Sequence, residues 1–209
     1  MPEWKIPAPL AVAWPLRDVK TATITERRLG DGRLEVKIEH AVLEGVTPAM
    51  LRWFISMLDQ QLDWQGQRLL AYRLWHPRDH VHHQIHGRRP DGTVVAPVRF
   101  HLVEAFGAQR RFLVEQWFEL LSLDETGFRL RGKNSGLQLE LHETFEAVPG
   151  GTKMTVTMWL GTANSFVSRV LVTLASRFKR AQLEAWKRHN VEEDGTLPFF
   201  LPELFARHH

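Results

Sequence analysis

Alternation of hydrophobic and polar residues runs through most of the chain and predicts a series of β-strands. Residues 21–46 alternate on either side of a Gly-Asp-Gly turn sequence, which predicts a hairpin with strands near 21–29 and 34–43. Turn-forming residues separate further predicted strands at 71–75, 94–106, 112–121, 128–131, 137–146 and 153–160. Strands that follow one another so closely favour an antiparallel sheet.

Hydrophobic residues at helical spacing predict helices before and after these strands. Thr47 and Pro48 are typical of a helix start and predict a helix over 49–58. The segment 62–70 is compatible with either a second short helix or a loop. A long amphipathic helix is predicted from 166 to about 193, and the apolar tail 197–205, which contains two prolines, is expected to pack across the body.

The order of these elements predicts the architecture. A hairpin, one or two short helices, a run of strands and one long C-terminal helix can form an antiparallel sheet wrapped around that helix, with a central cavity between the two. This is an α+β helix-grip arrangement, similar to that of the Bet v 1 and START proteins. No repeat or linker divides the sequence, so we expect residues 1–209 to form a single domain.

Composition narrows the classes of partner. The net charge is +3 and the basic pairs are short, which gives little support to nucleic-acid binding. The sequence contains no cysteine, which excludes disulfides, thiolate metal sites and a cysteine nucleophile. It has neither a signal pattern nor an apolar run of about 18 residues, so we expect a cytoplasmic protein without a membrane span. Eight tryptophans and twelve phenylalanines predict either a large aromatic core or a wide apolar pocket.

The stretch YRLWHPRDHVHH at residues 72–83 is too rich in histidine, aspartate and aromatic residues for ordinary surface. The proline within it sets a turn that could present His76 or His80 inward. His82 and His83 are neighbours and cannot share one face of a strand. Any one of these histidines could equally lie at the surface or make an ordinary hydrogen bond.

Other histidine and glutamate positions point to the same chemistry. His189 and Glu193 are four residues apart and share one face of the predicted C-terminal helix, although both face water if the helix frays after Arg188. Glu104 shares a strand face with phenylalanine and leucine side chains, where it would pair with an arginine or bind a cation. Two imidazoles and two carboxylates would suit zinc, and Mn²⁺ or Fe²⁺ is not excluded.

Together these stretches resemble the 2,4-diacetylphloroglucinol hydrolase family. The enzymes of this family hold zinc with two histidines and two glutamates in a Bet v 1-like cavity. They cleave the carbon–carbon bond that attaches an acetyl group to a phenolic ring. The resemblance covers the chain from about residue 50 onward and rests on YRLWHPRDH at 72–80, LVEAFG at 102–107, MWLG at 158–161, HNVEE at 189–193 and LPELF at 201–205.

The resemblance implies roles for individual residues. The metal ligands that it implies are His80, Glu104, His189 and Glu193. It also implies that Tyr72 hydrogen-bonds the substrate, that His83 stands where the family has a substrate-contacting asparagine, and that His142 matches a further catalytic histidine. His83 or His142 would then activate the attacking water. A second substrate-contacting tyrosine of the family is missing, and Thr157 is the counterpart that we assign. If the leucines that alternate with His142 face the cavity, His142 does not, unless a bulge intervenes.

The function that the resemblance implies is hydrolysis of a carbon–carbon bond in an acylated phenolic or β-diketone-like small molecule, with zinc as the expected cofactor. In the keto tautomer of such a substrate, the ring carbon that bears the acyl group becomes a leaving group. A different class of function is a carrier that binds an apolar or aromatic ligand in the cavity without chemistry. A homodimer is left open.

Overall fold

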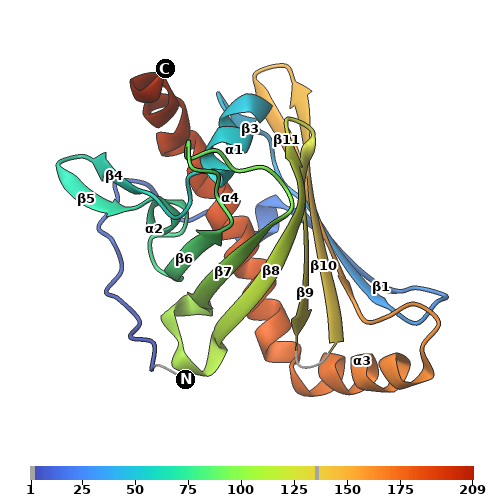
Figure 1. Cartoon of the computed structure of the whole chain (residues 1–209). Coiled ribbons are helices and arrows are strands. Elements are labelled where there is room, and N and C mark those ends of the chain that lie inside the picture. The colour runs from blue at the N-terminus through green and yellow to red at the C-terminus, as the bar shows by residue number, and fades with distance from the viewer. Residues whose placement is uncertain (1–2, 135–136) are drawn as a thin grey trace.

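A curved antiparallel sheet forms most of the molecule (Figure 1). The computed structural model describes residues 3–134 and 137–209. The strands of the sheet are β1 (Thr23–Arg28), β2 (Leu34–Glu39), β3 (Leu43–Glu44), β6 (His80–His86), β7 (Val98–Ala105), β8 (Leu113–Asp124), β9 (Gly127–Asn134), β10 (Leu137–Val148) and β11 (Gly151–Leu160). Within the described chain, eight of these nine strands pair in the order β1-β2-β11-β10-β9-β8-β7-β6. The ninth, β3, pairs with β11.

One long helix, α4 (Arg180–His208), lies along the inner side of the sheet, which curves around it (Figure 1). Its C-terminal half buries apolar residues at the helical positions i, i+3, i+4 and i+7, namely Leu197, Phe200, Leu201 and Leu204. The predicted α+β helix-grip architecture is confirmed. Among the described residues, no helix combines the length and the apolar character needed to cross a membrane.

The C-terminal region nevertheless differs from the prediction. The helix expected over 166–193 is two helices, α3 (Phe166–Phe178) and α4, which separate at Lys179. The segment 197–205 continues α4 and is not a separate tail. Both of its prolines lie inside the helix. A proline removes one helical hydrogen bond, and burial of the apolar residues around the two prolines offsets this loss.

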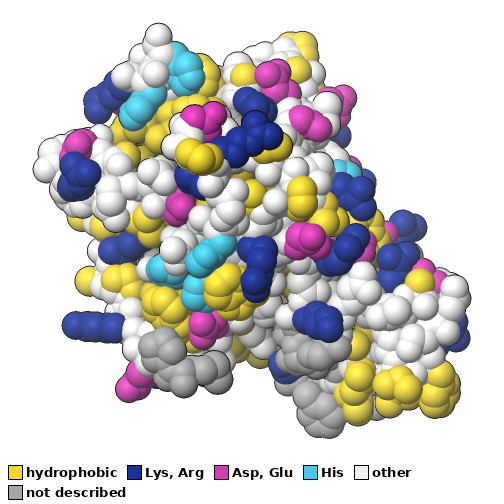
Figure 2. Space-filling view, viewed as in Figure 1, with side chains coloured by type: hydrophobic (Ala, Val, Ile, Leu, Met, Phe, Trp, Pro, Cys, Tyr) yellow, Lys and Arg dark blue, Asp and Glu magenta, His cyan; other side chains and the backbone are white. Residues whose placement is uncertain are grey.

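The first of these two helices lies outside the grip. Phe166 is 80% exposed, and Val167, Val170, Leu171 and Leu174 are exposed as well. Figure 2 shows hydrophobic side chains at the surface where α3 lies. The apolar stripe that the sequence places on one long helix therefore contributes to the interior mainly from α4.

The segment before β6 is also folded differently. Residues 61–70 form a hairpin of β4 (Gln61–Trp64) and β5 (Gln67–Leu70), where a helix or a loop was expected. Gln65 and Gly66 have φ angles of 48° and 77°, the positive values that a two-residue hairpin turn requires. Because the hairpin is short and its turn lacks the usual Asn-Gly sequence, the pattern alone does not reveal it.

The segment 71–75, predicted as a strand, is the short helix α2 (Ala71–Trp75). Its buried residues are Ala71, Tyr72, Leu74 and Trp75, which lie at helical and not at alternating spacing. In contrast, α1 (Pro48–Ile55) begins as predicted, because the side-chain oxygen of Thr47 accepts a hydrogen bond from the backbone N–H of Met50 at 3.3 Å.

The packing of α4 gives a first test. Phe200→Ala is expected to lower the free energy of unfolding by about 3–5 kcal/mol, because this buried ring packs against Trp14, Phe54 and Trp64. Phe199→Ala is the matched control. Phe199 is 49% exposed, and its loss is expected to change stability by less than about 1 kcal/mol. Urea denaturation followed by tryptophan fluorescence measures both. Equal losses would show that this part of α4 does not pack on the body as described.

Candidate metal centre

Strand β6 presents two histidines to the interior because it contains an irregularity. A regular strand would place residues 80 and 83 on opposite faces. The register between β6 and β7 shifts between His80 and His82, and this bulge allows His80 and His83 to lie buried on the inner side. His82 lies on the outer side against the ring of Trp4.

Strand β7 and helix α4 bring the other groups to His80. Glu104 is the direct partner of His80 in the register of β6 and β7. His189 and Glu193 lie one turn apart on a buried face of α4. The four residues that the resemblance implies as metal ligands therefore come together from two strands and one helix.

These four side chains converge through their ligand atoms. Glu193 Oε2 lies 3.1 Å from His80 Nε2 and 3.5 Å from His189 Nε2. Glu104 Oε1 lies 3.7 Å and 3.8 Å from the same two nitrogen atoms. A tetrahedral zinc ion with bonds of about 2.0–2.1 Å separates its ligand atoms by roughly 3.3–3.4 Å. The ligand atoms of His80, Glu104 and His189 all lie within 4.8 Å of one another, and Glu193 adds a carboxylate oxygen near both imidazole nitrogens. Two imidazoles and two carboxylates are a donor set that suits a divalent ion.

His80 is held in the tautomer that a metal requires. Its Nδ1 lies 2.6 Å from the backbone carbonyl oxygen of Tyr72. Because a carbonyl oxygen can only accept, Nδ1 carries the proton and Nε2 presents a lone pair to the two carboxylates. Burial lowers the pKa of His80. The ring of Tyr72 stacks on the imidazole with 3.6 Å between centroids, and its hydroxyl donates to Glu104.

His189 is oriented by a buried carboxylate. Its Nδ1 lies 3.1 Å from Asp79 Oδ2, and Asp79 also accepts hydrogen bonds from the backbone N–H groups of Gly107 and Ala108 at 2.8 Å and 3.1 Å. A carboxylate behind a metal-binding histidine fixes the ring and raises its basicity. Burial lowers the pKa of His189, but the charge of Glu193 and the hydrogen bond to Asp79 outweigh burial and raise the pKa well above its usual value.

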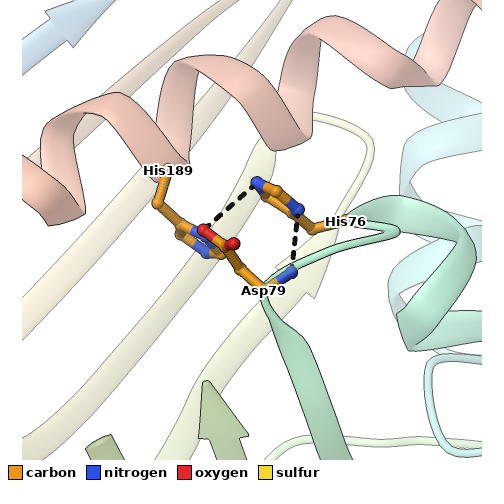
Figure 3. Close-up of side chains that lie close together, drawn as sticks. All are labelled: His76, Asp79 and His189. Carbon is orange, nitrogen blue, oxygen red and sulfur yellow. Dashed lines mark hydrogen bonds and ion pairs between the residues drawn. The ribbon is translucent and has the colours of Figure 1, made fainter. Parts of the chain in front are cut away.

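His76, Asp79 and His189 form a second cluster beside these four residues (Figure 3). The backbone N–H of Asp79 donates to His76 Nδ1 at 3.2 Å, so the proton of this imidazole lies on Nε2, 3.4 Å from Glu192 Oε2. Arg78 Nε donates to Asp79 at 2.7 Å. These groups are engaged with one another, so we interpret the cluster as support for His189.

Three of the four candidate ligands, Glu104, His189 and Glu193, line a cavity between the sheet and α4. The cavity has a volume of about 170 Å³. Its polar lining includes Tyr72, His83, Gln116, Glu143 and Asn190. Its apolar lining includes Phe100, Leu102, Phe118, Leu139, Met158 and Trp186. The aromatic residues thus serve both the core and an apolar pocket, the two alternatives that the composition left open.

Tyr72 and His83 lie at this cavity, as expected. Burial raises the pKa of Tyr72 well above its usual value, so the phenol keeps its proton. Burial lowers the pKa of His83 well below its usual value, so the imidazole is neutral at neutral pH. The His83 ring contacts the rings of Tyr72 and Phe100, with centroids 4.8 Å and 4.9 Å apart.

His142 and Thr157 lie on the opposite side of the sheet. Leu141 and Met158, their neighbours in sequence, line the cavity, and alternation turns His142 and Thr157 to the outer face. The two residues are partners in an uninterrupted register between β10 and β11, so no bulge in this pair of strands turns them inward. This placement corrects the expectation that His142 acts on a bound substrate and that Thr157 replaces the missing tyrosine.

Sequence reasoning missed polar residues around the centre. Asn190 Nδ2 donates to Glu193 Oε1 at 3.0 Å and so supports this ligand. Glu143 lines the cavity from β10. Its alternation with leucines on an apolar face is the same anomaly that singled out Glu104, so the pattern contained a signal for it. Asp79 lies within the histidine-rich stretch 72–83, and no spacing pattern there distinguishes it as the partner of His189.

A second buried pair lies next to Glu193. His40 Nε2 and Asp194 Oδ2 are 3.1 Å apart, and both side chains are fully buried. Burial lowers the pKa of His40 to about 4 and raises the pKa of Asp194 well above its usual value. The pair is therefore neutral at neutral pH, which avoids the desolvation of two isolated charges.

Comparison with known proteins places the fold. No family model and no curated protein matches the sequence. Among solved structures, 79% of the chain superposes on half of the di-domain ARO/CYC BexL from the BE-7585A biosynthetic pathway, with 9% identity and a TM-score of 0.54. The chain has a helix-grip fold. The chain is also similar to protein Ms6760 from Mycobacterium smegmatis, with 16% identity over 84% of this chain and 96% of that chain and a TM-score of 0.48. A START superfamily protein from the same organism is 13% identical over 74% of this chain and 94% of that chain, with a TM-score of 0.42. The superposition on BexL supports the fold alone, and the resemblance to the hydrolase family remains an inference from the sequence.

The convergence of the four ligand residues is tested by metal titration. One equivalent of zinc is expected to bind, and Glu104→Gln or Glu193→Gln, which remove a charge and keep the size, are expected to weaken binding by at least about 100-fold. Glu140→Gln, on the outer face of β10, is the control and is expected to leave the affinity unchanged. Calorimetry with metal-free protein measures all of these variants. Wild-type affinity in both ligand variants would place the metal elsewhere.

Zinc affinity is also expected to depend on pH. The raised pKa keeps His189 protonated at neutral pH in the metal-free protein, and a metal ion must displace that proton. Below the pKa of His189, affinity is therefore expected to rise about tenfold per pH unit. Calorimetry in buffers of different ionisation enthalpy counts the protons released, and about one is expected per ion bound. An affinity that does not change with pH around neutrality would contradict this account.

Proposed function

We propose that the protein is a metal-dependent hydrolase that cleaves the bond between an acyl carbon and a phenolic ring carbon. The observation that supports this most strongly is the convergence of His80, Glu104, His189 and Glu193. The last three of these residues also line an apolar cavity. Two imidazoles and two carboxylates suit zinc, and Mn²⁺ and Fe²⁺ accept the same nitrogen and oxygen donors.

Charge supports a divalent ion at this place. With both histidines neutral, the two glutamates contribute two negative charges, which balance the two positive charges of the ion. Zinc in such a site supplies Lewis-acid chemistry that polarises a carbonyl group. His80 and His189 would present their Nε2 atoms, and Tyr72 and Asn190 would hold the two glutamates by hydrogen bonds.

The size and lining of the cavity favour a substrate with one aromatic ring. Its volume of about 170 Å³ is close to that of an apolar cavity of about 150 Å³ that accommodates benzene. Phe100, Leu102 and Phe118 supply apolar contacts for a ring. Tyr72 and His83 line the same cavity as Glu104, His189 and Glu193, so the acyl and hydroxyl substituents of a phenol would be directed toward the ion.

The side chains at this wall support a hydrolytic step. Neutral His83 can accept a proton from a water molecule that attacks the acyl carbonyl. Tyr72 keeps its proton, so its hydroxyl remains a hydrogen-bond donor that positions Glu104 or the substrate. When the acyl group leaves as a carboxylic acid, the ring carbon keeps the bonding electron pair and requires a proton.

A second candidate function is a carrier for an apolar or aromatic ligand. It is favoured by β11, which turns Met158 and Leu160 toward the cavity at the strand where the resemblance leads us to expect a substrate-contacting tyrosine. A carrier would hold a ligand by apolar contacts and release it unchanged.

Acylated phenols distinguish the two functions. The zinc-loaded protein is expected to release acetic acid from mono- or diacetylated phloroglucinol, and treatment with a chelator is expected to abolish the release. Chromatography of both products measures this. His142→Ala, on the outer face of the sheet, is expected to keep the rate within about twofold. A zinc-loaded protein that binds these compounds and returns them unchanged would support the carrier and exclude the hydrolase for this substrate class.

A further inference from the structure

Glu143 places a carboxyl group in apolar surroundings at the cavity wall. It is 2% exposed and lines the cavity together with Leu139 and Leu141 from the same face of β10. Its partners in register on the neighbouring strands are Phe128 and Val156, both buried. The carboxyl group therefore lies at the proposed substrate site, on the sheet and not on the helix that carries two of the metal ligands.

The groups around this carboxyl do not favour its ionised form. Within the part of the chain that the structure describes, Glu143 Oε2 has no hydrogen-bond partner. The titratable groups that act on it are Asp194 and Glu193 from α4 and Glu104 from β7, all of them acidic. Burial first, and then these three groups, raise the pKa of Glu143 well above its usual value.

A bound metal ion would not reverse this balance. The two positive charges of the ion are matched by the charges of Glu104 and Glu193, so the ion mainly cancels the repulsion from these two residues. Burial, the largest cause, remains in place. A carboxylic acid in such an environment keeps a proton at neutral pH and can donate it.

We propose that Glu143 is the general acid of this site and gives its proton to the ring carbon as the acyl group leaves, an inference that rests on the proposed hydrolase function. The oxygen of water bonds to the acyl carbon, and the bond between the acyl carbon and the ring carbon breaks. The electron pair of that bond stays on the ring carbon, which takes the proton of Glu143. The proton lost by the water restores the acid form of Glu143, so the products are a carboxylic acid and the deacylated phenol.

Other groups at the cavity are less suited to this step. The hydroxyl of Tyr72 already donates to Glu104, and burial raises its pKa, which makes it a weaker acid. His83 is neutral, and a neutral imidazole is a far weaker acid than a carboxylic acid. Asp194 Oδ2 lies 3.1 Å from His40 Nε2, and Asp194 is not among the described residues that line the cavity.

Infrared spectroscopy of the zinc-loaded protein tests the protonation of Glu143 without turnover. Carbonyl stretches of protonated carboxylic acids are expected at neutral pH from Glu143 and from Asp194, and Glu143→Gln is expected to lose one of them. Glu140→Gln, from the outer face of the same strand, is the matched control and is expected to remove a carboxylate band instead. A Glu143→Gln spectrum that loses a carboxylate band and no carboxylic acid band would overturn the proposal.

Steady-state kinetics tests the transfer of the proton. Glu143→Gln is expected to lower kcat by at least about 100-fold, with zinc affinity unchanged and KM within about threefold of the wild-type value. Glu143→Asp keeps an acid and is expected to recover part of the rate. The fall in wild-type activity at alkaline pH, where Glu143 loses its proton, is expected to be missing from the residual activity of Glu143→Gln.

The outcomes separate this inference from the function on which it rests. Wild-type turnover in Glu143→Gln would overturn the role of Glu143 and leave the hydrolase function in place. Loss of activity together with loss of zinc binding would assign Glu143 a structural role and also overturn the proposal. A wild-type protein that releases no acid from any acylated phenol would remove the hydrolase function, and the general-acid role with it.

Discussion

A lone pair on nitrogen and a carboxylate oxygen repel each other at short distance in a dry interior, and this constraint governs the centre of the molecule. The carbonyl oxygen of Tyr72 fixes the proton of His80 on Nδ1, so Nε2 faces Glu193 Oε2 at 3.1 Å with its lone pair. Glu104 adds a second carboxylate beside the same nitrogen. Such an arrangement is stable when positive charge lies among these atoms. A proton on His189 supplies one such charge in the metal-free protein, and a divalent ion would supply two.

The two halves of helix α4 have different roles at this centre: the C-terminal half packs in the apolar core, and the turns before it carry His189 and Glu193. The apolar half, which includes Leu197, Phe200 and Leu204, anchors the helix in the core. The preceding turns carry buried polar groups that would not stay buried without this anchor. The Thr196 hydroxyl, which lies between the halves, donates to the backbone carbonyl of Trp75 at 2.6 Å. This contact ties α4 to α2 and thereby to Tyr72, whose carbonyl orients His80.

Much of the centre could be predicted from local patterns. One helix carries His189 and Glu193 at a spacing of four residues, and one strand carries Glu104 among apolar neighbours. Each of these patterns can be read from a single secondary-structure element. The proximity of these residues to His80 depends on tertiary structure and was predicted only from the resemblance to the hydrolase family. The bulge in β6 that lets His80 and His83 share one side depends on pairing with β7, which the sequence of β6 alone does not specify.

The failures of prediction have equally specific causes. His142 and Glu143 are neighbours on β10, so strand alternation allows only one of them to face the cavity. The family resemblance favoured His142. The strand pattern favoured Glu143, which is the residue that lines the cavity. Residues 197–205 were separated from the helix because prolines usually end helices, whereas their apolar spacing already matched α4. In each case the periodicity of hydrophobic residues was a better guide than the identity of a single residue.

X-ray absorption spectroscopy at the zinc edge of the stoichiometrically loaded protein tests the central claim most directly. The account predicts nitrogen and oxygen ligands at about 2.0–2.1 Å, with the multiple-scattering signal of two imidazoles and loss of one imidazole in the His189→Ala variant. A six-coordinate shell dominated by water, or a spectrum that the His189→Ala variant leaves unchanged, would show that the four buried side chains do not bind the ion and would contradict the account.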